Sequence, residues 1–363
     1  MTLLQQLNDS PYDFYFLCVD KFLDIDLPEL KNFISLNPEK LNITLSEKNS
    51  GRLLAHPTTQ DFINHNSAET GRKPAIIPFK PSAKIDFICQ KNNWTLIANP
   101  GPLNRFIEDK IKFSEMCQKL SLPTIDNQIN PLNPTTYQQA QEKFGSDLVV
   151  QTHFGWAGNS THLSNKYEDL NIPSETIVKF SPYLSGYSLL NNCCLTNSGL
   201  MQSPPALQYT GLKPLTKNPF ATVGRQWPSF APPKIIAQVE DITNKFSLIL
   251  QQYNYRGFFG LDFFVHQDKV FLLECNPRLT ASFAFYTQIE FCHQLEPLFL
   301  YHLASFINLD YPLVSRFNSP LVGSEITVKD KNGVTTKKFQ QFSALSTETN
   351  PITISPDIIS QLL

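Results

Sequence analysis

The sequence lacks long apolar runs, and it contains few charged residues for a chain of this length. No stretch of about 18 consecutive apolar residues occurs, so a membrane-spanning helix is not expected. Charged residues make up 17% of the chain, and the formal net charge is −2. This balance offers no basic surface that would attract nucleic acid or an anionic membrane.

Signals for secretion and for disulfide or metal chemistry are missing as well. The segment Met1–Asp13 has neither the basic region nor the apolar core of a signal peptide. The seven cysteines include no C-x-x-C pair, and their odd number and apolar surroundings indicate free thiols in a reducing cytoplasm. The adjacent Cys193 and Cys194 form either a redox-active pair or two buried strand residues, and their apolar context favours the strand.

Residues 1–100 show an alternation of expected strands with helical or irregular stretches. Tyr12–Val19, Ile85–Cys89 and Trp94–Ala98 are apolar runs that predict strands, and this alternation indicates an α/β layer domain. No G-x-G-x-x-G follows the first of them, so a dinucleotide site is not supported. The Asn-Pro-Gly-Pro segment at 99–102 predicts a domain boundary. A chain of 363 residues suits two or three packed subdomains.

The chain does contain a pronounced aromatic hairpin pattern between Arg256 and Arg278. Two apolar runs, Phe258–Val265 and Val270–Cys275, flank a short polar break at residues 266–269. Runs of this composition around such a break predict two antiparallel strands joined by a turn.

Each strand of this hairpin carries one carboxylate among hydrophobic residues. If the turn centres on Asp268, Asp262 and Glu274 lie directly opposite each other, with Cβ atoms roughly 5 Å apart. Like charges at this distance repel unless a cation lies between them. Asn276 adds a neutral oxygen, and such oxygens suit a hard cation, Mg²⁺ or Mn²⁺. Because side chains alternate between faces, one face is expected to hold residues 262, 264, 270, 272, 274 and 276.

The segment Glu274-Cys275-Asn276-Pro277-Arg278 resembles the Glu-x-Asn-x-Arg motif of the ATP-grasp fold, in which an acidic residue lies on the preceding strand. Asp262 stands 12 residues before Glu274. The closing arginine is similar to the biotin-carboxylase and carbamoyl-phosphate-synthase branch rather than to the D-alanine ligase branch. The alternative is an ordinary hairpin with two tolerated acids, which requires the spacing, the asparagine and the arginine to coincide.

The resemblance implies an α/β protein of the α+β ATP-grasp type. Residues 1–100 would form an α/β pre-ATP-grasp domain, and residues 101–310 a split ATP-grasp module that binds the nucleotide between its halves, 101–200 and 201–310. Residues 311–363 would form a small C-terminal appendage. The implied ligands are ATP and Mg²⁺ (or Mn²⁺). The residues implied as metal ligands are Asp262, Glu274 and Asn276, and Arg278 is implied as a catalytic contact.

An amphipathic helix is expected from about Leu103 to Leu120, with an apolar stripe that includes Phe106, Phe113 and Cys117. Lys110 falls in the gap of this stripe, where a lysine needs an anion or a route to solvent. In ATP-grasp proteins a lysine on the corresponding helix reaches the nucleotide phosphates. The resemblance implies this role for Lys110, and extension of its side chain to solvent is the alternative.

Leu148–Gln151 predicts a strand that leads into a loop with two glycines, Gly155 and Gly158. The loop resembles the flexible ATP-grasp loop that closes over the phosphates, where backbone N–H groups cradle the anion. The resemblance also places Gln151 at the nucleotide. Many relatives carry a lysine at this position, so neutralisation of the phosphates is expected to depend more on the other cationic groups and on metal.

Thr176–Phe180 and Leu189–Thr196 are interpreted as a pair of strands. In ATP-grasp proteins the segment between them pairs with adenine, so the resemblance implies contacts from Phe180, Tyr183 and Leu184. An acidic residue that binds ribose often follows the glycine of this segment. Here that glycine is followed by tyrosine and serine, so a ribose contact from this segment is not supported.

Residues 201–233 contain seven prolines and no sustained periodicity, which predicts a long irregular loop with a functional role. Within it, Arg225 is either a bidentate contact to a substrate carboxylate, and so a catalytic-site residue, or a plain surface arginine. Two further helices and a tail hairpin are expected at Lys234–Tyr253, about Ser282–Phe306, and Glu325–Val328 with Val334–Phe339.

The resemblance implies ATP-dependent ligation of a carboxylate to an amine through an acylphosphate, with ADP and phosphate as products. The alternatives are a carboxylase or carbamoyl-phosphate-like synthase that acts through carboxyphosphate, and a non-catalytic nucleotide-binding protein. The implied partners are small-molecule carboxylate and amine substrates, without nucleic acid or membrane. Whether the chain forms a homodimer is left undecided by the sequence.

Overall fold

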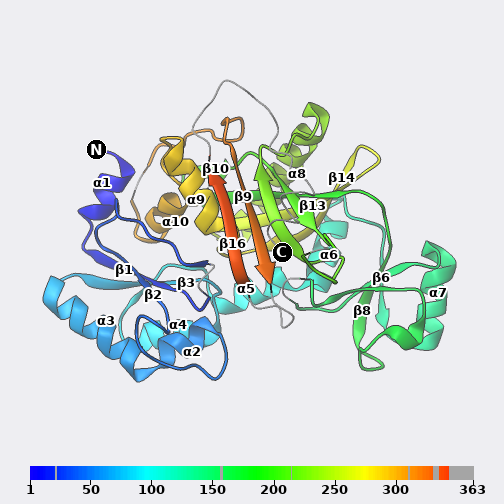
Figure 1. The fold of residues 1–363 in the computed structure, drawn as a ribbon, viewed down its shortest axis with the longest axis horizontal. Coiled ribbons are helices and arrows are strands. Elements are labelled where there is room, and N and C mark those ends of the chain that lie inside the picture. The colour runs from blue at the N-terminus through cyan, green and yellow to red at the C-terminus, as the bar shows by residue number, and fades with distance from the viewer. Residues whose placement is uncertain (21–22, 156–157, 214, 310, 330–334, 343–363) are drawn as a thin grey trace.

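The computed structural model describes the chain except for residues 21–22, 156–157, 214, 310, 330–334 and 343–363. Its described strands form three β-sheets, of four, eight and four strands. In Figure 1 the large sheet occupies the centre, with the N-terminal sheet and the sheet of residues 128–182 on opposite sides below it. The mixture of a parallel sheet with antiparallel ones confirms the predicted α/β class.

The N-terminal sheet is parallel, as alternating strands and helices predict. Its order is β2-β1-β3-β4, and buried side chains of β1 and β3 pack against the helices beside them. The elements are α1 (Leu3–Asn8), β1 (Tyr12–Leu17), β2 (Phe33–Leu36), α2 (Ser50–Ala55), α3 (Pro57–Thr70), β3 (Lys73–Pro78), α4 (Ala83–Lys91) and β4 (Thr95–Leu96).

The segment Ile85–Cys89, expected as a strand, lies instead in α4, so this prediction is wrong. Ser82 caps the helix, because its side chain accepts a hydrogen bond from the N–H of Ile85. Ile85 and Ile88 are buried while Phe87 is exposed, which is the spacing of a helix face. A short apolar run does not by itself distinguish a strand from a buried helix.

The second sheet is antiparallel, with the order β5-β8-β6-β7. One of its faces is buried against α7 in a small apolar core, which leaves the other face for the large cleft described below. The elements of this region are α5 (Gly101–Glu108), α6 (Lys110–Lys119), β5 (Gln128–Pro131), α7 (Pro134–Phe144), β6 (Leu148–Gln151), β7 (Thr161–Ser164), the 3₁₀ turn Tyr167–Asp169 and β8 (Ile177–Pro182).

The single helix expected from Leu103 to Leu120 is two helices, α5 and α6, because Asp109 interrupts it. Its backbone is extended, with φ −68° and ψ 111°, and its carboxylate accepts hydrogen bonds from the N–H groups of Ile111 and Lys112. An aspartate in this position starts a new helix by capping its free N–H groups. As a result, Lys110 is the first residue of α6.

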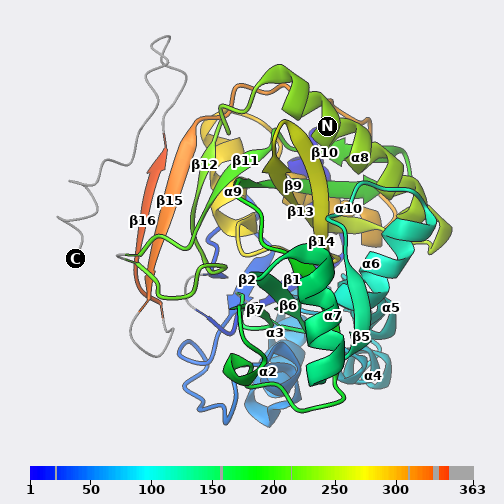
Figure 2. The same ribbon diagram turned by 90° about the vertical axis from the view of Figure 1, so that its right-hand side faces the viewer.

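The central sheet has the order β14-β13-β9-β11-β12-β15-β16, with β10 paired to β9 outside this path. Figure 2 shows the tail strands β15 and β16 at the opposite edge from β14. The elements are β9 (Tyr187–Thr196), β10 (Gly199–Gln202), β11 (Ala206–Thr210), β12 (Thr222–Trp227), α8 (Pro233–Gln252), β13 (Gly257–His266), β14 (Lys269–Asn276), α9 (Phe283–Cys292), α10 (Leu298–Phe306), β15 (Gly323–Lys329) and β16 (Thr335–Phe342).

Two further expectations need correction in this region. Residues 201–233 are not one irregular loop, because they include β11 and β12. Strands β8 and β9 are not a pair either: β8 pairs with β5 and β6, whereas β9 pairs with β10, β11 and β13. Residues 183–186 therefore link the two sheets.

The remaining helices and the tail follow the sequence more closely. The helix expected at Lys234–Tyr253 is confirmed as α8, whereas the one expected at Ser282–Phe306 is two helices, α9 and α10, separated at residues 293–297. The tail hairpin is confirmed by the pairing of β15 with β16. Its predicted turn, 331–333, lies outside the described residues.

All seven cysteines are free. Cys193 and Cys194 are buried residues of β9, which confirms their interpretation as strand residues. Across the described part of the chain, no helix has both the length and the apolar character needed to cross a bilayer.

The core between α10 and the central sheet contains a buried histidine, His302. Its Nδ1 accepts a hydrogen bond of 3.0 Å from the N–H of Phe258. Burial lowers the pKa of His302 to about 3, although a hydrogen bond with the backbone of Ile97 opposes the shift.

We expect His302 to make the fold sensitive to mild acid. An unfolded histidine titrates near pH ~6.5, so below that pH the unfolded state takes up a proton that the folded state refuses. This contribution is complete above the unfolded pKa and shrinks by about 2 kcal/mol between pH 7 and pH 5. Urea unfolding at both pH values should show that His302→Gln loses about 2 kcal/mol less of its free energy of unfolding between pH 7 and pH 5 than the wild type does. Glutamine keeps a hydrogen-bond acceptor and a donor at this position. The exposed His65→Gln is the control, and equal losses in all three proteins would contradict the assignment.

Candidate active site

A cavity of about 1600 Å³ lies between the small antiparallel sheet and the central sheet. It receives side chains from α6, from β6 and β8, and from β11 to β15. Nearly all of the residues predicted from sequence line it: Lys110, Gln151, Gly155, Gly158, Tyr183, Leu184, Arg225, Asp262, Glu274, Asn276 and Arg278. The tertiary structure therefore brings together residues from both predicted halves of the module.

The hairpin β13–β14 places Asp262 and Glu274 as cross-strand partners, which confirms the predicted register. The turn and the pairing between it and Asp262 differ from the expectation, which was a turn centred on Asp268 with regular alternation. The turn contains two residues, Gln267 and Asp268, with φ of 47° and 62°, which is the pattern of a tight hairpin turn. A bulge after Asp262 then shifts the pairing by one residue.

Because of the same bulge, the residues on the face that carries the carboxylates differ from the predicted set. Val270 and Leu272 were expected beside Glu274, but both are buried in the apolar core together with Phe263 and Val265. A shift of one residue moves side chains to the opposite face. Strand β14 therefore keeps Glu274 at the cleft, together with Leu273, while Val270 and Leu272 pack in the core.

Asp262 is held by two amide groups. Gln208 Nε2 donates to its Oδ1 at 2.7 Å, and Asn276 Nδ2 donates to its Oδ2 at 3.0 Å. Burial raises the pKa of Asp262, while the charges of Arg225 and Lys110 and these two hydrogen bonds oppose the rise. Across the hairpin, the carboxylate of Glu274 forms an ion pair with Lys110.

The donor set at this point suits a hard cation in part. Within the described ranges, no group of three or more His, Cys, Asp or Glu residues gathers around one point. Asp262 and Glu274 supply carboxylate oxygens, whereas Asn276 turns its nitrogen to Asp262 and its Oδ1 accepts from Arg278 at 3.0 Å. That oxygen retains a second lone pair. Mg²⁺ commonly binds one or two carboxylates plus substrate phosphates, so these residues fit such an ion.

Arg278 is buried and extensively paired. Its Nε and Nη2 donate to Glu108 Oε1 at 3.1 and 3.0 Å, and Nη1 donates to the Leu279 carbonyl at 3.1 Å. Lys80 Nζ lies 2.7 Å from the other oxygen of Glu108. Burial alone would raise the pKa of Glu108, but Arg278 and Lys80 hold it below its usual value. Arg278 thus connects the hairpin to α5.

Lys110 lies at the floor of the cleft with 8% of its surface exposed, so it does not extend to solvent. Burial lowers its pKa to about 8, and the charges of Asp262 and Glu108 oppose this shift. Lys110 is held in place by the N-capping Asp109 beside it. That residue also binds His153 Nδ1, at 2.8 and 2.9 Å, and so anchors the start of the glycine-bearing loop.

The two glycines of the glycine-bearing loop are closely packed. A side chain at Gly155 would collide with Ser160, and Gly158 has a φ of +81° and approaches Phe220 of the β11–β12 connection. Gln151 does not point freely into the cleft, because its Nε2 donates to Thr161 Oγ1 at 3.0 Å. Gly158 therefore meets Asn218 and Phe220 of the β11–β12 connection across the cleft.

The side chain of Phe180, which was expected to contact adenine, lies on the face of β8 that points away from the cleft. The Phe180 side chain is fully buried against Tyr137, with ring centroids 6.2 Å apart, so it points away from the cleft. Its neighbours Lys179 and Ser181 line the cleft instead. Sequence analysis missed these two, although the alternation of apolar and polar residues after Thr176 is the signal that identifies them.

Arg225 forms an ion pair with Glu325 of β15, from Nη1 to Oε1 at 2.7 Å. The sequence left two alternatives for Arg225, a substrate contact and a plain surface arginine. Its side chain is only 13% exposed, so it is not a plain surface arginine. Its Nε is buried without a hydrogen-bond partner among the described residues. The tail strand β15 therefore contributes a carboxylate to the cleft, which the sequence did not indicate.

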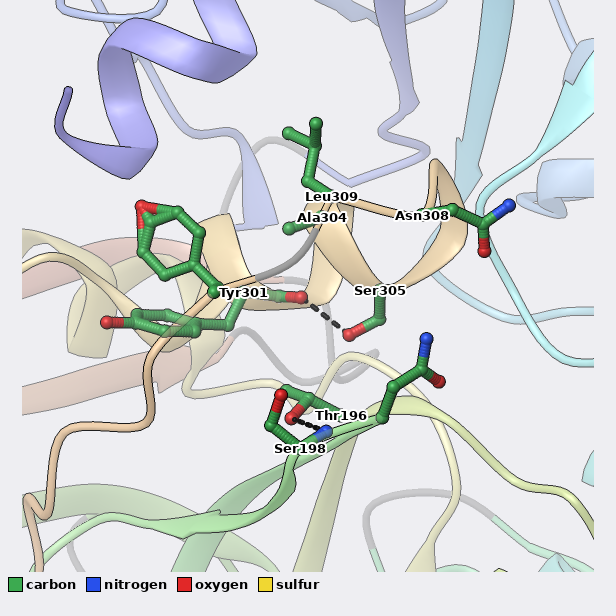
Figure 3. A pocket seen from close by; sticks show the side chains of 9 residues that line it. Thr196, Ser198, Tyr301, Ala304, Ser305, Asn308 and Leu309 are labelled. Carbon is green, nitrogen blue, oxygen red and sulfur yellow. Dashed lines mark hydrogen bonds between the residues drawn. The ribbon is translucent and has the colours of Figure 1, made fainter.

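A smaller cavity of about 260 Å³ lies between the end of β9 and α10 (Figure 3). Hydroxyl and amide side chains such as Thr196, Ser305 and Asn308 line it, together with Tyr301. It contains no charged lining residue and none of the residues predicted from sequence. The large cleft is therefore the better candidate for a charged ligand.

Neither a protein-family model nor the sequence of a curated protein matches the chain. Solved structures match it over most of its length. An N5-carboxyaminoimidazole synthetase from Staphylococcus aureus, complexed with ADP, has 13% identity and a TM-score of 0.61, over 87% of this chain and 82% of that one. A biotin carboxylase–β-γ-ATP complex from Campylobacter jejuni has 13% identity and a TM-score of 0.63, over 92% and 74%.

A third match is the biotin carboxylase domain of the Hydrogenobacter thermophilus 2-oxoglutarate carboxylase, in complex with MgADP, ADP and bicarbonate. It has 11% identity and a TM-score of 0.62, over 88% of this chain and 76% of that one. Likeness at such low identity concerns the fold. The chain has the ATP-grasp fold, as its sequence predicts.

Proposed function

We propose that this chain, with its ATP-grasp fold, is an ATP-dependent enzyme that joins a small carboxylic acid to an amine and releases ADP and phosphate. The observation that carries the proposal is the opposition of Asp262 and Glu274 beside the buried Lys110. Carboxylates that hold a cation next to a lysine that meets phosphate suit a metal–ATP complex. The nucleotides bound in the matched structures are consistent with this proposal.

In the proposed reaction, an oxygen of the acid bonds to the γ-phosphorus of ATP, and ADP leaves. The amine nitrogen then attacks the carbonyl carbon of the acylphosphate, loses a proton and displaces phosphate, so that an amide forms. A Mg²⁺ or Mn²⁺ ion held by Asp262, Glu274 and Asn276 would neutralise charge on the phosphates. Lys110 and the N–H groups near Gly155 and Gly158 would orient them.

The remaining residues receive roles that follow from their contacts. Arg225 is proposed to bind the substrate carboxylate, because its Nε has no protein partner among the described residues. Arg278 is proposed to reach the transferring group with the one Nη1 hydrogen that Glu108, Asn276 and the Leu279 carbonyl leave unbonded. Adenine is proposed to lie along the linker of residues 183–186. There it would contact the protein backbone near Phe180, and Tyr183 and Leu184.

A second candidate function is a carboxylase in which bicarbonate is the acid, activated as carboxyphosphate. The bicarbonate bound in one of the matched structures favours it. The two functions differ in what stimulates ADP release. Purified protein with ATP and Mg²⁺ should be screened against amino acids and small acids, each with and without amines, in bicarbonate-free and bicarbonate-containing buffer. Release that needs bicarbonate identifies the carboxylase, and absence of release under every condition would contradict both enzymatic proposals.

We expect ATP to bind in a saturable manner and far more tightly with Mg²⁺ than without it. The physical reason is that Asp262 and Glu274 place negative charge beside the proposed phosphate site, and that charge repels ATP unless a cation lies between them. Calorimetric titrations with Mg²⁺ and with excess chelator measure the difference. Equal affinity under both conditions would rule out the metal assignment.

A further inference from the structure

Strand β8 brings a further lysine, Lys179, to the cleft, opposite the glutamine of β6. Gln151 and Lys179 are cross-strand partners in the small sheet. Their neighbours Val150 and Phe180 point into the small apolar core, whereas Gln151, Lys179 and Ser181 line the cleft. Lys179 is 9% exposed, so most of its side chain has left water.

The ammonium group of Lys179 has no ion-pair or hydrogen-bond partner within the part of the chain that the structure describes, although its backbone pairs with β5 and β6. The described carboxylates that line the cleft are engaged with other groups: Asp20 with Lys48, Asp262 with Gln208 and Asn276, Glu274 with Lys110, and Glu325 with Arg225. A buried ammonium group without an anion is costly. Burial, followed by the charge of Lys110, lowers the pKa of Lys179 to about 8. The site therefore favours a ligand that brings negative charge.

The chemistry of the surroundings indicates which anion fits. Lys179 and Lys110 lie close enough for their charges to repel, so an anion that carries several charges satisfies both better than a single carboxylate. The glycine-bearing loop, with its backbone N–H groups, borders the same cleft. These features together are typical of a polyphosphate site.

We propose that Lys179 binds the phosphates of the nucleotide and supplies, from β8, the positive charge that Gln151 cannot supply from β6. This inference rests on the proposed function only for the identity of the ligand as ATP. The proposal also explains why Gln151 is tied to Thr161: its side chain is free to bind the neighbouring strand because the phosphate contact comes from the facing residue.

The test uses the pairing of the two strands. Calorimetry should compare ATP, adenosine and inorganic tripolyphosphate as ligands of the wild type, of Lys179→Gln and of the double variant Gln151→Lys/Lys179→Gln. The exposed Lys166→Gln on the same lobe is the control. Loss of one charge-assisted contact should weaken ATP and tripolyphosphate about 10- to 100-fold and change adenosine by less than about twofold.

The double variant returns a lysine to the same pair of residues, so it should recover most of the lost affinity. Lys179→Gln should melt at the same temperature as the wild type or higher, because it removes an unpaired buried charge. A lower melting temperature with unchanged phosphate affinity would show a structural role and overturn the proposal.

The outcomes separate this inference from the proposed function. If Lys179→Gln binds ATP and tripolyphosphate like the wild type, the role of Lys179 is wrong although ATP-dependent catalysis stands. If the wild type binds tripolyphosphate through Lys179 but does not bind ATP, the phosphate site stands and the proposed function fails. Wild-type protein that binds neither ligand overturns both.

Discussion

Replacing Glu274 with glutamine is expected to leave the fold intact and to slow ADP release about 100-fold or more. Glutamine has nearly the same shape, but it lacks the charge that faces Asp262 across the hairpin and pairs with Lys110. Both the proposed cation and the lysine would lose their shared partner. Steady-state ADP release, measured on protein whose melting curve matches the wild type, tests this expectation.

Glu115→Gln is a matched control for this variant, because Glu115 lies on α6 like Lys110 but is exposed to solvent. It should retain wild-type turnover. If a folded Glu274→Gln protein also turns over at the wild-type rate, Glu274 has no part in the chemistry, and the opposed carboxylates are a structural feature of the hairpin.

Arg278→Ala is expected to destabilise the fold by about 3 kcal/mol, because it removes the buried partner of Glu108, whose side chain is only 15% exposed and which then keeps its ion pair with Lys80. The hairpin and α5 would lose their connection, so nucleotide affinity should fall, and turnover should fall further because Arg278 is also proposed to reach the transferring group. Arg278→Lys should recover only part of each property, since an ammonium group cannot bond Glu108 and Asn276 in the same planar geometry. Thermal melts, ATP titrations and ADP-release rates on the same proteins provide the measurement.

The control for this experiment is Arg52→Ala, which breaks an exposed arginine–glutamate pair with Glu47. It should change stability by no more than about 1 kcal/mol. A different pattern for Arg278→Ala would change its role: if turnover falls while melting temperature and ATP affinity stay unchanged, Arg278 acts on the transferring group instead of positioning the hairpin.

Much of the candidate site could be predicted because its signals are local. The aromatic runs around Asp262 and Glu274 define a hairpin by alternation and by a polar turn, which places the two residues on adjacent strands. The two-residue turn alone would pair Asp262 with Leu273, and the bulge after Asp262 completes the pairing with Glu274. Even here the detail differed, because the bulge after Asp262 moved Val270 and Leu272 to the core face. A bulge of this kind has no clear signature in the strand sequence.

Predictions failed where a short pattern suits two structures or where distant strands choose their partners. The run Ile85–Cys89 fits a strand and a helix equally well, and the capping Ser82 decided for the helix. The pairing of Thr176–Phe180 with the strand that follows it was expected from proximity in the chain. Instead β8 joined β6 in a separate sheet, and this choice turned Lys179 toward the cleft.

The sequence by itself indicated the ATP-grasp fold, through the resemblance of residues 256–278, and it placed Asp262 and Glu274 on the two strands of one hairpin, because alternation around a turn is a local signal. Only the tertiary structure decided which charges are paired. Arg278 meets Glu108 across 170 positions of the chain, and Arg225 meets Glu325 across 100. Such pairs form when whole sheets and helices pack, and a buried charge then takes whichever opposite charge the packing brings within reach.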